Sequence, residues 1–287
     1  MNARLLSLSL LAAGLLAAAV PLHAEQTQAS SSVTAVAAID PAVQLEEMAR
    51  LFRANDVTGL ARAMVPPSQW EQFRLAYQQK QREPTSAEDR AEFEQKIGRL
   101  IGPNAVDELM AEIEPKLEKA RPSAPGALLM GMGALQVAVS SPDSDLTEEQ
   151  RAALTSALPG IQRWASTTDF LSSERMRQAL SLLTGAARGL GISELDQLKA
   201  LPLEAVLDRS GTLLAAAKEA VRLYGIDLNA VAESLRVDLL AIEGDTARVR
   251  TTVNLFGAPI WAEHELVLME GRWYGSKQVV RWEDAEG

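Results

Sequence analysis

The histidine at position 264 stands between two glutamates in the stretch WAEHELVLMEGRWY, residues 261–274. Histidine and carboxylate side chains together can transfer protons or bind metal ions. In a β-strand, however, successive side chains point to opposite faces, so Glu263 and Glu265 share one face and His264 occupies the other. The apparent cluster therefore divides into two candidates, one on each face of a predicted strand.

The glutamate face resembles a solvated surface. If FGAP, residues 256–259, is the loop between two strands, Arg250 is expected opposite Glu265 and Thr252 opposite Glu263. An exposed cross-strand charge pair contributes only about 0.2 to 1 kcal/mol. We therefore expect no active site on this face.

The histidine face carries the best candidate site. The same register places Thr251 opposite His264, and loops at EGDT and EGR add Asp238 beside Thr251 and Gln278 beside His264. The predicted ligand-binding row is thus Asp238, Thr251, His264 and Gln278, with apolar rows on either side. Asp238 and His264 would lie roughly 9 to 10 Å apart, too far for a catalytic triad, so the row favours binding over catalysis.

A structural interpretation of this row competes with the functional one, and we favour it. Buried polar groups normally find partners, so the row would lie at the sheet edge or bond to a covering helix. A slip of one residue in the register would remove the row altogether, because it would move each side chain to the other face.

The elements that must position these residues change character near residue 236. Residues 237–287 show a period of two in four segments separated by turn residues, which predicts a four-stranded antiparallel meander. Residues 40–236 show helical periods, broken by glycine and proline into about eight to ten helices. We predict an α+β fold, with a mostly helical N-terminal and central region followed by the meander, and helices on one sheet face.

Helix starts are marked by capping residues. Asp40 followed by Pro41 predicts the first helix, with Val43, Met48, Leu51 and Phe52 on its apolar face. Capping boxes are expected at Ser68 with Glu71, Thr85 with Glu88, and Thr147 with Gln150. Pro115 is expected to kink or end the helix around it, because it removes a backbone donor.

The most apolar internal stretch is APGALLMGMGALQVAV, residues 124–139. It lacks the glycine order, the lysine and the preceding strand of a phosphate-binding loop. We expect a buried helix whose glycines, Gly126, Gly131 and Gly133, allow close packing. Insertion into a membrane surface is the alternative, although no basic face supports it.

The N-terminus has the features of a secretory signal. Arg4 precedes an apolar run from Leu5 to Val20, and Ala24 follows at a suitable cleavage point. We predict a signal peptide over residues 1–24, a flexible leader over residues 25–39, and a periplasmic or secreted product. No stretch after the signal reaches the roughly 20 apolar residues that a membrane-spanning helix requires, so we expect no transmembrane segment after cleavage.

Composition excludes several chemistries. The chain has no cysteine, which removes disulfides, thiolate catalysis and cysteine metal sites. One mature histidine leaves no ligand set for zinc, so we expect neither metal nor cofactor. The net charge is −10, and no basic cluster offsets it, which makes nucleic acid an unsuitable partner.

The segment AIEGDTARVRTTVNLFGAPIWAEHELVLMEGRWY, residues 241–274, resembles the C-terminal sheet of nuclear transport factor two-like domains of secreted bacterial proteins. LFRANDVTGLARAMVPP, residues 51–67, is similar to the helical opening of that family. The resemblance implies a cone-shaped pocket under a curved sheet, in a superfamily that includes enzymes and binding modules. Its motifs are structural turns, so no catalytic residue is carried over.

Together these features predict a non-enzymatic binding module of the periplasm, for a small apolar ligand or an envelope partner. One alternative is an enzyme that uses Asp238 or His264 as a general base in a pocket. A second alternative is a helical scaffold of an envelope complex, which predicts a large exposed apolar patch on a helical face.

Overall fold

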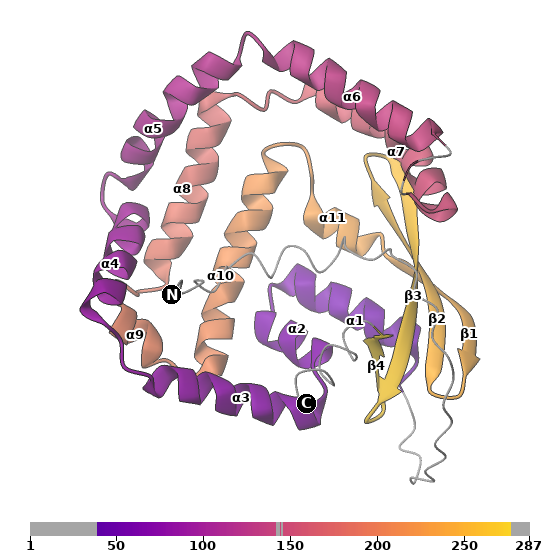
Figure 1. Cartoon of the computed structure of the whole chain (residues 1–287), viewed down its shortest axis with the longest axis horizontal. Helices are drawn as coiled ribbons and strands as arrows, with labels where there is room; N and C mark the ends of the chain where they lie inside the picture. Colours follow the sequence, from indigo (N-terminus) through magenta and orange to yellow (C-terminus); the bar gives the residue numbers. More distant parts are fainter. Residues whose placement is uncertain (1–38, 142–143, 145, 277–287) are drawn as a thin grey trace. The chain divides into compact units, whose positions relative to one another are not determined.

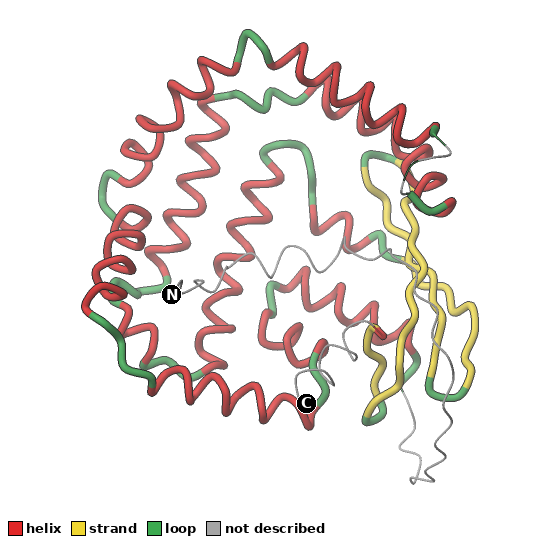
Figure 2. The backbone as a smooth tube through the Cα atoms, viewed as in Figure 1, coloured by secondary structure: helices red, strands yellow, loops and turns green. Residues whose placement is uncertain are grey.

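The computed structural model describes residues 39–141, 144 and 146–276. Its helices are α1 (Pro41–Ala54), α2 (Val57–Met64), α3 (Pro67–Arg82), α4 (Ala87–Ile101), α5 (Ala105–Ala120), α6 (Ala124–Ser140), α7 (Glu148–Thr167), α8 (Ser173–Gly189), α9 (Leu195–Lys199), α10 (Leu203–Arg222) and α11 (Leu228–Glu233). Its strands are β1 (Arg236–Glu243), β2 (Thr246–Leu255), β3 (Ala258–Met269) and β4 (Arg272–Gly275). Within the described part of the chain, strands begin only after the last helix, as Figure 2 shows. The predicted α+β class is confirmed.

Helix α1 begins where the sequence predicts. The Asp40 carboxylate accepts hydrogen bonds from the backbone N–H groups two and three residues later, at 2.8 and 3.4 Å. Pro41 fills the first helical position, where its missing N–H group costs nothing. The helix ends at Asn55, whose φ of 59° lies in the left-handed region typical of a helix end.

Of the three expected capping boxes, one forms as predicted and one forms with different residues. Thr147 and Gln150 exchange side-chain and backbone hydrogen bonds at the start of α7, as predicted. At the start of α4 the box is made by Ser86 and Asp89, one residue later than expected. The box expected at Ser68 does not form, because α3 already begins at Pro67 and has no side-chain cap.

Helices α8 and α10 lie side by side and form the centre of the helical packing, as Figure 1 shows. Helices α4 and α5 contact α8, while α2 and α3 contact α10. The buried positions of α8 and α10 are mostly small residues, which permit close approach. They are Ala179, Thr184, Ala186 and Ala187 on α8, and Leu203, Gly211, Ala216, Lys218 and Ala220 on α10.

The four strands form the predicted antiparallel meander, in the order β1-β2-β3-β4. Two tight turns join the last three strands. Phe256 and Gly257 have φ values of 55° and 77°, and Glu270 and Gly271 have 52° and 79°. Positive φ at both central residues is the signature of the type I′ turn, which matches the twist of paired strands.

One face of the sheet packs on α1. Ala247, Val249, Leu266 and Trp273 form a buried cluster, and Leu45 of α1 packs against it. On α1 itself the buried positions are Pro41, Gln44 and Leu51, whereas Val43, expected on the apolar face, is 57% exposed. The polar residue Gln44 therefore takes a position that the apolar pattern did not predict.

Helix α7 contacts β3 and meets the turn between β2 and β3. A methyl group at Gly160 would lie only 1.8 Å from the Phe256 carbonyl oxygen, so the helix backbone touches the turn. The rings of Trp164 and Phe256 are 4.8 Å apart. This packing compensates for the left-handed backbone of Phe256, which costs roughly 1 to 2 kcal/mol for a residue with a Cβ atom. The described helices and strands belong to one compact unit.

Candidate functional site

The structure brings together two members of the predicted polar row. Thr251 Oγ1 and His264 Nε2 are 2.8 Å apart, and Thr251 Oγ1 also lies 3.4 Å from the Ala262 carbonyl oxygen, to which it donates. Both side chains are partly buried. Burial lowers the pKa of His264 below its ordinary value of 6.5, so the imidazole is neutral at pH 7.

The two residues are diagonal neighbours rather than the direct partners that we expected. His264 pairs with Val249 and Thr251 pairs with Ala262. The difference arises at the turn, which uses only Phe256 and Gly257 instead of four residues. This shift of two residues preserves the face of every side chain, which is why Thr251 and His264 still meet.

Asp238 was placed on the wrong face. The register between β1 and β2 shifts at Leu240, where a β-bulge separates the pair Leu239 and Val249 from the pair Ala241 and Arg248. Asp238 therefore pairs with Arg250 and is exposed on the face opposite His264. One extra residue in a strand moves each side chain beyond it to the opposite face of the sheet. A bulge has no reliable signal in the sequence.

Gln278, the fourth member of the row, lies outside the described residues. The row is thus reduced to Thr251 and His264, whose polar groups contact each other. Ligand binding at this pair stays a prediction.

The glutamate face behaves as a solvated surface. Arg250 forms its ion pair with Glu263, at 2.7 Å, and not with Glu265 as we expected. The Arg250 guanidinium also lies 4.7 Å from the centre of the Trp261 ring. These contacts hold the cross-strand residues together.

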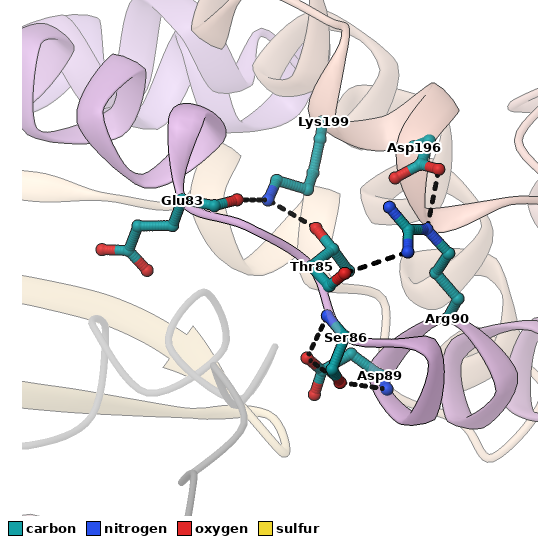
Figure 3. Close-up of polar contacts among 7 residues, drawn as sticks. All are labelled: Glu83, Thr85, Ser86, Asp89, Arg90, Asp196 and Lys199. Carbon is teal, nitrogen blue, oxygen red and sulfur yellow. Dashed lines mark hydrogen bonds and ion pairs between the residues drawn. The ribbon is translucent and has the colours of Figure 1, made fainter.

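A polar cleft of about 370 Å³ lies where the α3–α4 loop meets α9. Figure 3 shows the side chains of Lys199, Arg90 and Asp196 engaged with neighbouring groups. Lys199 Nζ donates to the Glu83 carbonyl oxygen at 2.6 Å and to Thr85 Oγ1 at 2.7 Å. Arg90 forms an ion pair with Asp196 at 2.9 Å. The cleft is therefore explained as the junction that fixes α9 to the loop.

A second cleft, of about 590 Å³, lies between α8 and α10. Its lining includes Arg177, which pairs with Asp107, and Arg222, which pairs with Glu219. Neither cleft is lined by a residue of the sheet. Across the described residues, no group of three or more His, Asp or Glu side chains could hold a metal ion.

Lys218 is a buried cation, only 3% exposed. Its ammonium group donates to the carbonyl oxygens of Phe52, at 2.8 Å, and Arg53, at 3.3 Å, and to Asn229 Oδ1, at 2.7 Å. Burial lowers its pKa, and the negative charge of Asp227 opposes that shift. Because its ammonium group binds two carbonyl oxygens at the C-terminal end of α1 and the Asn229 side chain of α11, Lys218 has a structural role.

Helix α6 overturns the expectation of a buried helix at residues 124–139. Only Val139 of its described residues is buried. Leu129 is 75% exposed, Met130 72% and Val137 67%. Between Ala124 and Ser140 the chain has no charged residue. The apolar composition predicted a covered helix, whereas the described part of the chain leaves most of α6 exposed.

By length and composition, no single helix of the described segments could cross a membrane. The pair α5 and α6 passes that test together, but the two helices are bent by 73° at the break between them.

Comparison with known proteins gives no match to a family model, a curated protein or a solved structure.

Proposed function

We propose that this protein is a non-enzymatic binding protein of the cell envelope, and that α6 docks it to a protein partner. The exposed apolar surface of α6 carries this proposal. Among the three functions that the sequence allows, the scaffold of an envelope complex is the one that predicts such a surface.

The physical argument rests on the cost of exposing apolar side chains. Each Å² of apolar surface removed from water contributes about 25 cal/mol, so an exposed apolar helix is stabilised by any apolar cover. A helix that is hydrophobic on all sides is normally buried. Leu129 and Met130 are each more than two-thirds exposed, and adjacent exposed apolar residues of this kind mark interaction surfaces.

The small-ligand and enzyme hypotheses have less support. The first cleft is polar, whereas the second is lined in part by Leu182 and Leu223. Charged side chains in both clefts, such as Arg90 and Arg177, already have partners within the chain. Asp238, one of the two general bases considered, is exposed on the other face of the sheet from His264. The His264 imidazole contacts Thr251, which gives it a partner in the fold.

Placement in the envelope depends on the signal peptide predicted over residues 1–24, which lie outside the described residues. Fractionation of the host cell followed by intact-mass measurement tests it. A periplasmic or secreted product shortened near Ala24 would support the placement. A cytoplasmic product of full length would contradict it.

Photo-crosslinking tests the docking surface in the host cell. A photo-reactive phenylalanine analogue at Leu129 or Met130 should give a discrete adduct, because both side chains are exposed on α6. The matched control is the same analogue at Gln79, an exposed position on α3. The absence of an adduct specific to α6 would refute the proposal.

A further inference from the structure

Most residues of α6 are exposed, and the helix packs on α7. Val139 is buried, and Met132 and Leu135, on the same side of the helix, are half-buried. The opposite side carries Gly126, Met130, Gly133 and Val137, all exposed. We call these four residues the outer face of α6.

The spacing of the outer face is that of a helix-pairing seam. Its residues are separated by four, three and four positions, which is the a/d spacing of helices that pack along their length. Glycine alternates with a larger side chain. Nothing lies within 4 Å of the Cβ position at Gly126 or Gly133, so the space beside both glycines is open.

The order of small and large residues on the outer face is complementary to the same face of a second copy in one orientation only. When two such helices run antiparallel about a point midway between Met130 and Gly133, Gly126 faces Val137 and Met130 faces Gly133. Each large side chain then meets an open glycine. In a parallel pair, glycine would face glycine and methionine would face methionine, which leaves a void beside a clash. A twofold interface requires such self-complementarity.

Charge favours the same orientation. Residues 116–121, before α6, contain three basic residues and one acidic residue, whereas residues 142–149, after it, contain four acidic residues and no basic one. In chain order α6 follows the basic segment and precedes the acidic one, so an antiparallel pair sets chain segments of opposite charge at the same end. The outer face itself is uncharged, so two chains of net charge −10 can meet there without placing like charges in contact.

We propose that two copies of this chain pair antiparallel through the outer face of α6. The inference rests on the proposed function, since it identifies the first partner of that docking surface as a second copy. The pairing buries the Met130 and Val137 side chains, which the single chain leaves exposed.

The oligomeric state of the purified full chain is the first test. Sedimentation equilibrium should show a dimer for the natural chain. The variant Met130→Glu/Val137→Glu should weaken dimerisation by more than about tenfold, because it places carboxylates in an apolar contact. The control Leu75→Glu, at a half-exposed position on α3, should remain dimeric. Circular dichroism confirms that each variant is folded.

Either a monomeric natural chain or a dimer that the α6 variant does not weaken would overturn the proposal. Vesicles of phosphatidylcholine provide the remaining comparison. A monomer that sediments with these vesicles through α6 would replace the second copy with a lipid surface.

Cysteine crosslinking tests the orientation, and the natural chain has no cysteine to interfere. The double variant Gly126→Cys/Val137→Cys should form a disulfide-linked dimer on oxidation, because the two positions face each other across an antiparallel pair. Each single variant should not, since its two copies would be roughly 16 Å apart along the helices. Crosslinking of the single variants would indicate a parallel pair and would contradict the inference.

The two proposals can fail separately. A heterologous adduct at Met130 in the cell, with a monomeric purified chain, would refute the pairing and keep the docking function. The absence of any adduct and of any dimer would refute both.

Discussion

Gln44 on α1 holds both backbone hydrogen-bonding groups of Trp273 on β4. Its side-chain amide accepts from the Trp273 N–H at 2.9 Å and donates to the Trp273 carbonyl oxygen at 2.6 Å. The Trp273 indole N–H also donates to the Ile39 carbonyl oxygen at 2.7 Å. One side chain thus satisfies the backbone N–H and C=O groups of Trp273 at the open edge of β4, as a neighbouring strand would.

Replacing Gln44 with Ala should destabilise the protein by about 2 to 4 kcal/mol, because it leaves the buried backbone N–H and C=O groups of Trp273 without partners. The midpoint of urea unfolding measures the loss. Gln72→Ala, at an exposed position on α3, is the matched control and should change stability by less than about 0.5 kcal/mol. Equal effects of the two substitutions would show that the contact does not matter.

Replacing Lys218 with Met should lower the free energy of unfolding by about 2 to 4 kcal/mol. The methionine keeps the packing but removes the donors to Phe52, Arg53 and Asn229. Lys96→Met, at an exposed lysine of α4, should have little effect. If both variants unfold at the natural denaturant concentration, Lys218 does not secure the end of α1.

Two glycine substitutions should act in opposite directions. Gly160→Ala should destabilise the protein by about 1 to 3 kcal/mol, because the new methyl group meets the backbone of Phe256. Gly185→Ala on α8 should stabilise it by about 0.5 to 1 kcal/mol, since nothing lies within 4 Å of the new methyl group and alanine favours the helix. Thermal unfolding followed by circular dichroism gives both signs, and a stabilising Gly160→Ala would contradict the close contact.

His264 should make stability depend on pH in the acid range. Burial lowers its pKa in the folded state below 6.5, so between these two values the unfolded chain binds more protons than the folded chain. The contribution is complete above pH 6.5 and is lost as pH falls through the lowered pKa.

Thermal unfolding at neutral pH and at about pH 5 tests this effect. His264→Gln should lose less stability on acidification than the natural chain, because glutamine does not titrate. Thr251→Val is the control that removes the partner of the imidazole but keeps the titrating group. A natural chain and a His264→Gln variant with the same pH dependence would disprove the assignment.

The parts of the fold that follow from local chemistry were predictable. The cap at Asp40, the box at Thr147 and the change to a period of two near residue 236 each depend on neighbouring residues alone. Pro115 was expected to kink or end its helix, and α5 does not end there but continues to Ala120 with the proline in its interior. Tertiary packing can outweigh the loss of one backbone hydrogen bond.

The candidate site was predictable only in part, because it depended on counting residues through turns. The turn after β2 shifts the register by two residues, so Thr251 and His264 keep the predicted face of the sheet. The single extra residue at Leu240 shifts the register by one, so Asp238 lies on the other face. The exposure of α6 was not predictable for a different reason, since an apolar composition favours burial but does not show how the rest of the chain packs against the helix.

The exposure of the outer face of α6 also has an evolutionary consequence. Only Val139 of its described residues is buried, so substitutions along the outer face cost the folded chain little. Mutations on this face can accumulate without producing variants that fail to fold. A protein with such a surface can acquire new associations while its architecture stays constant, because the outer face contributes little to the packing that keeps the chain folded.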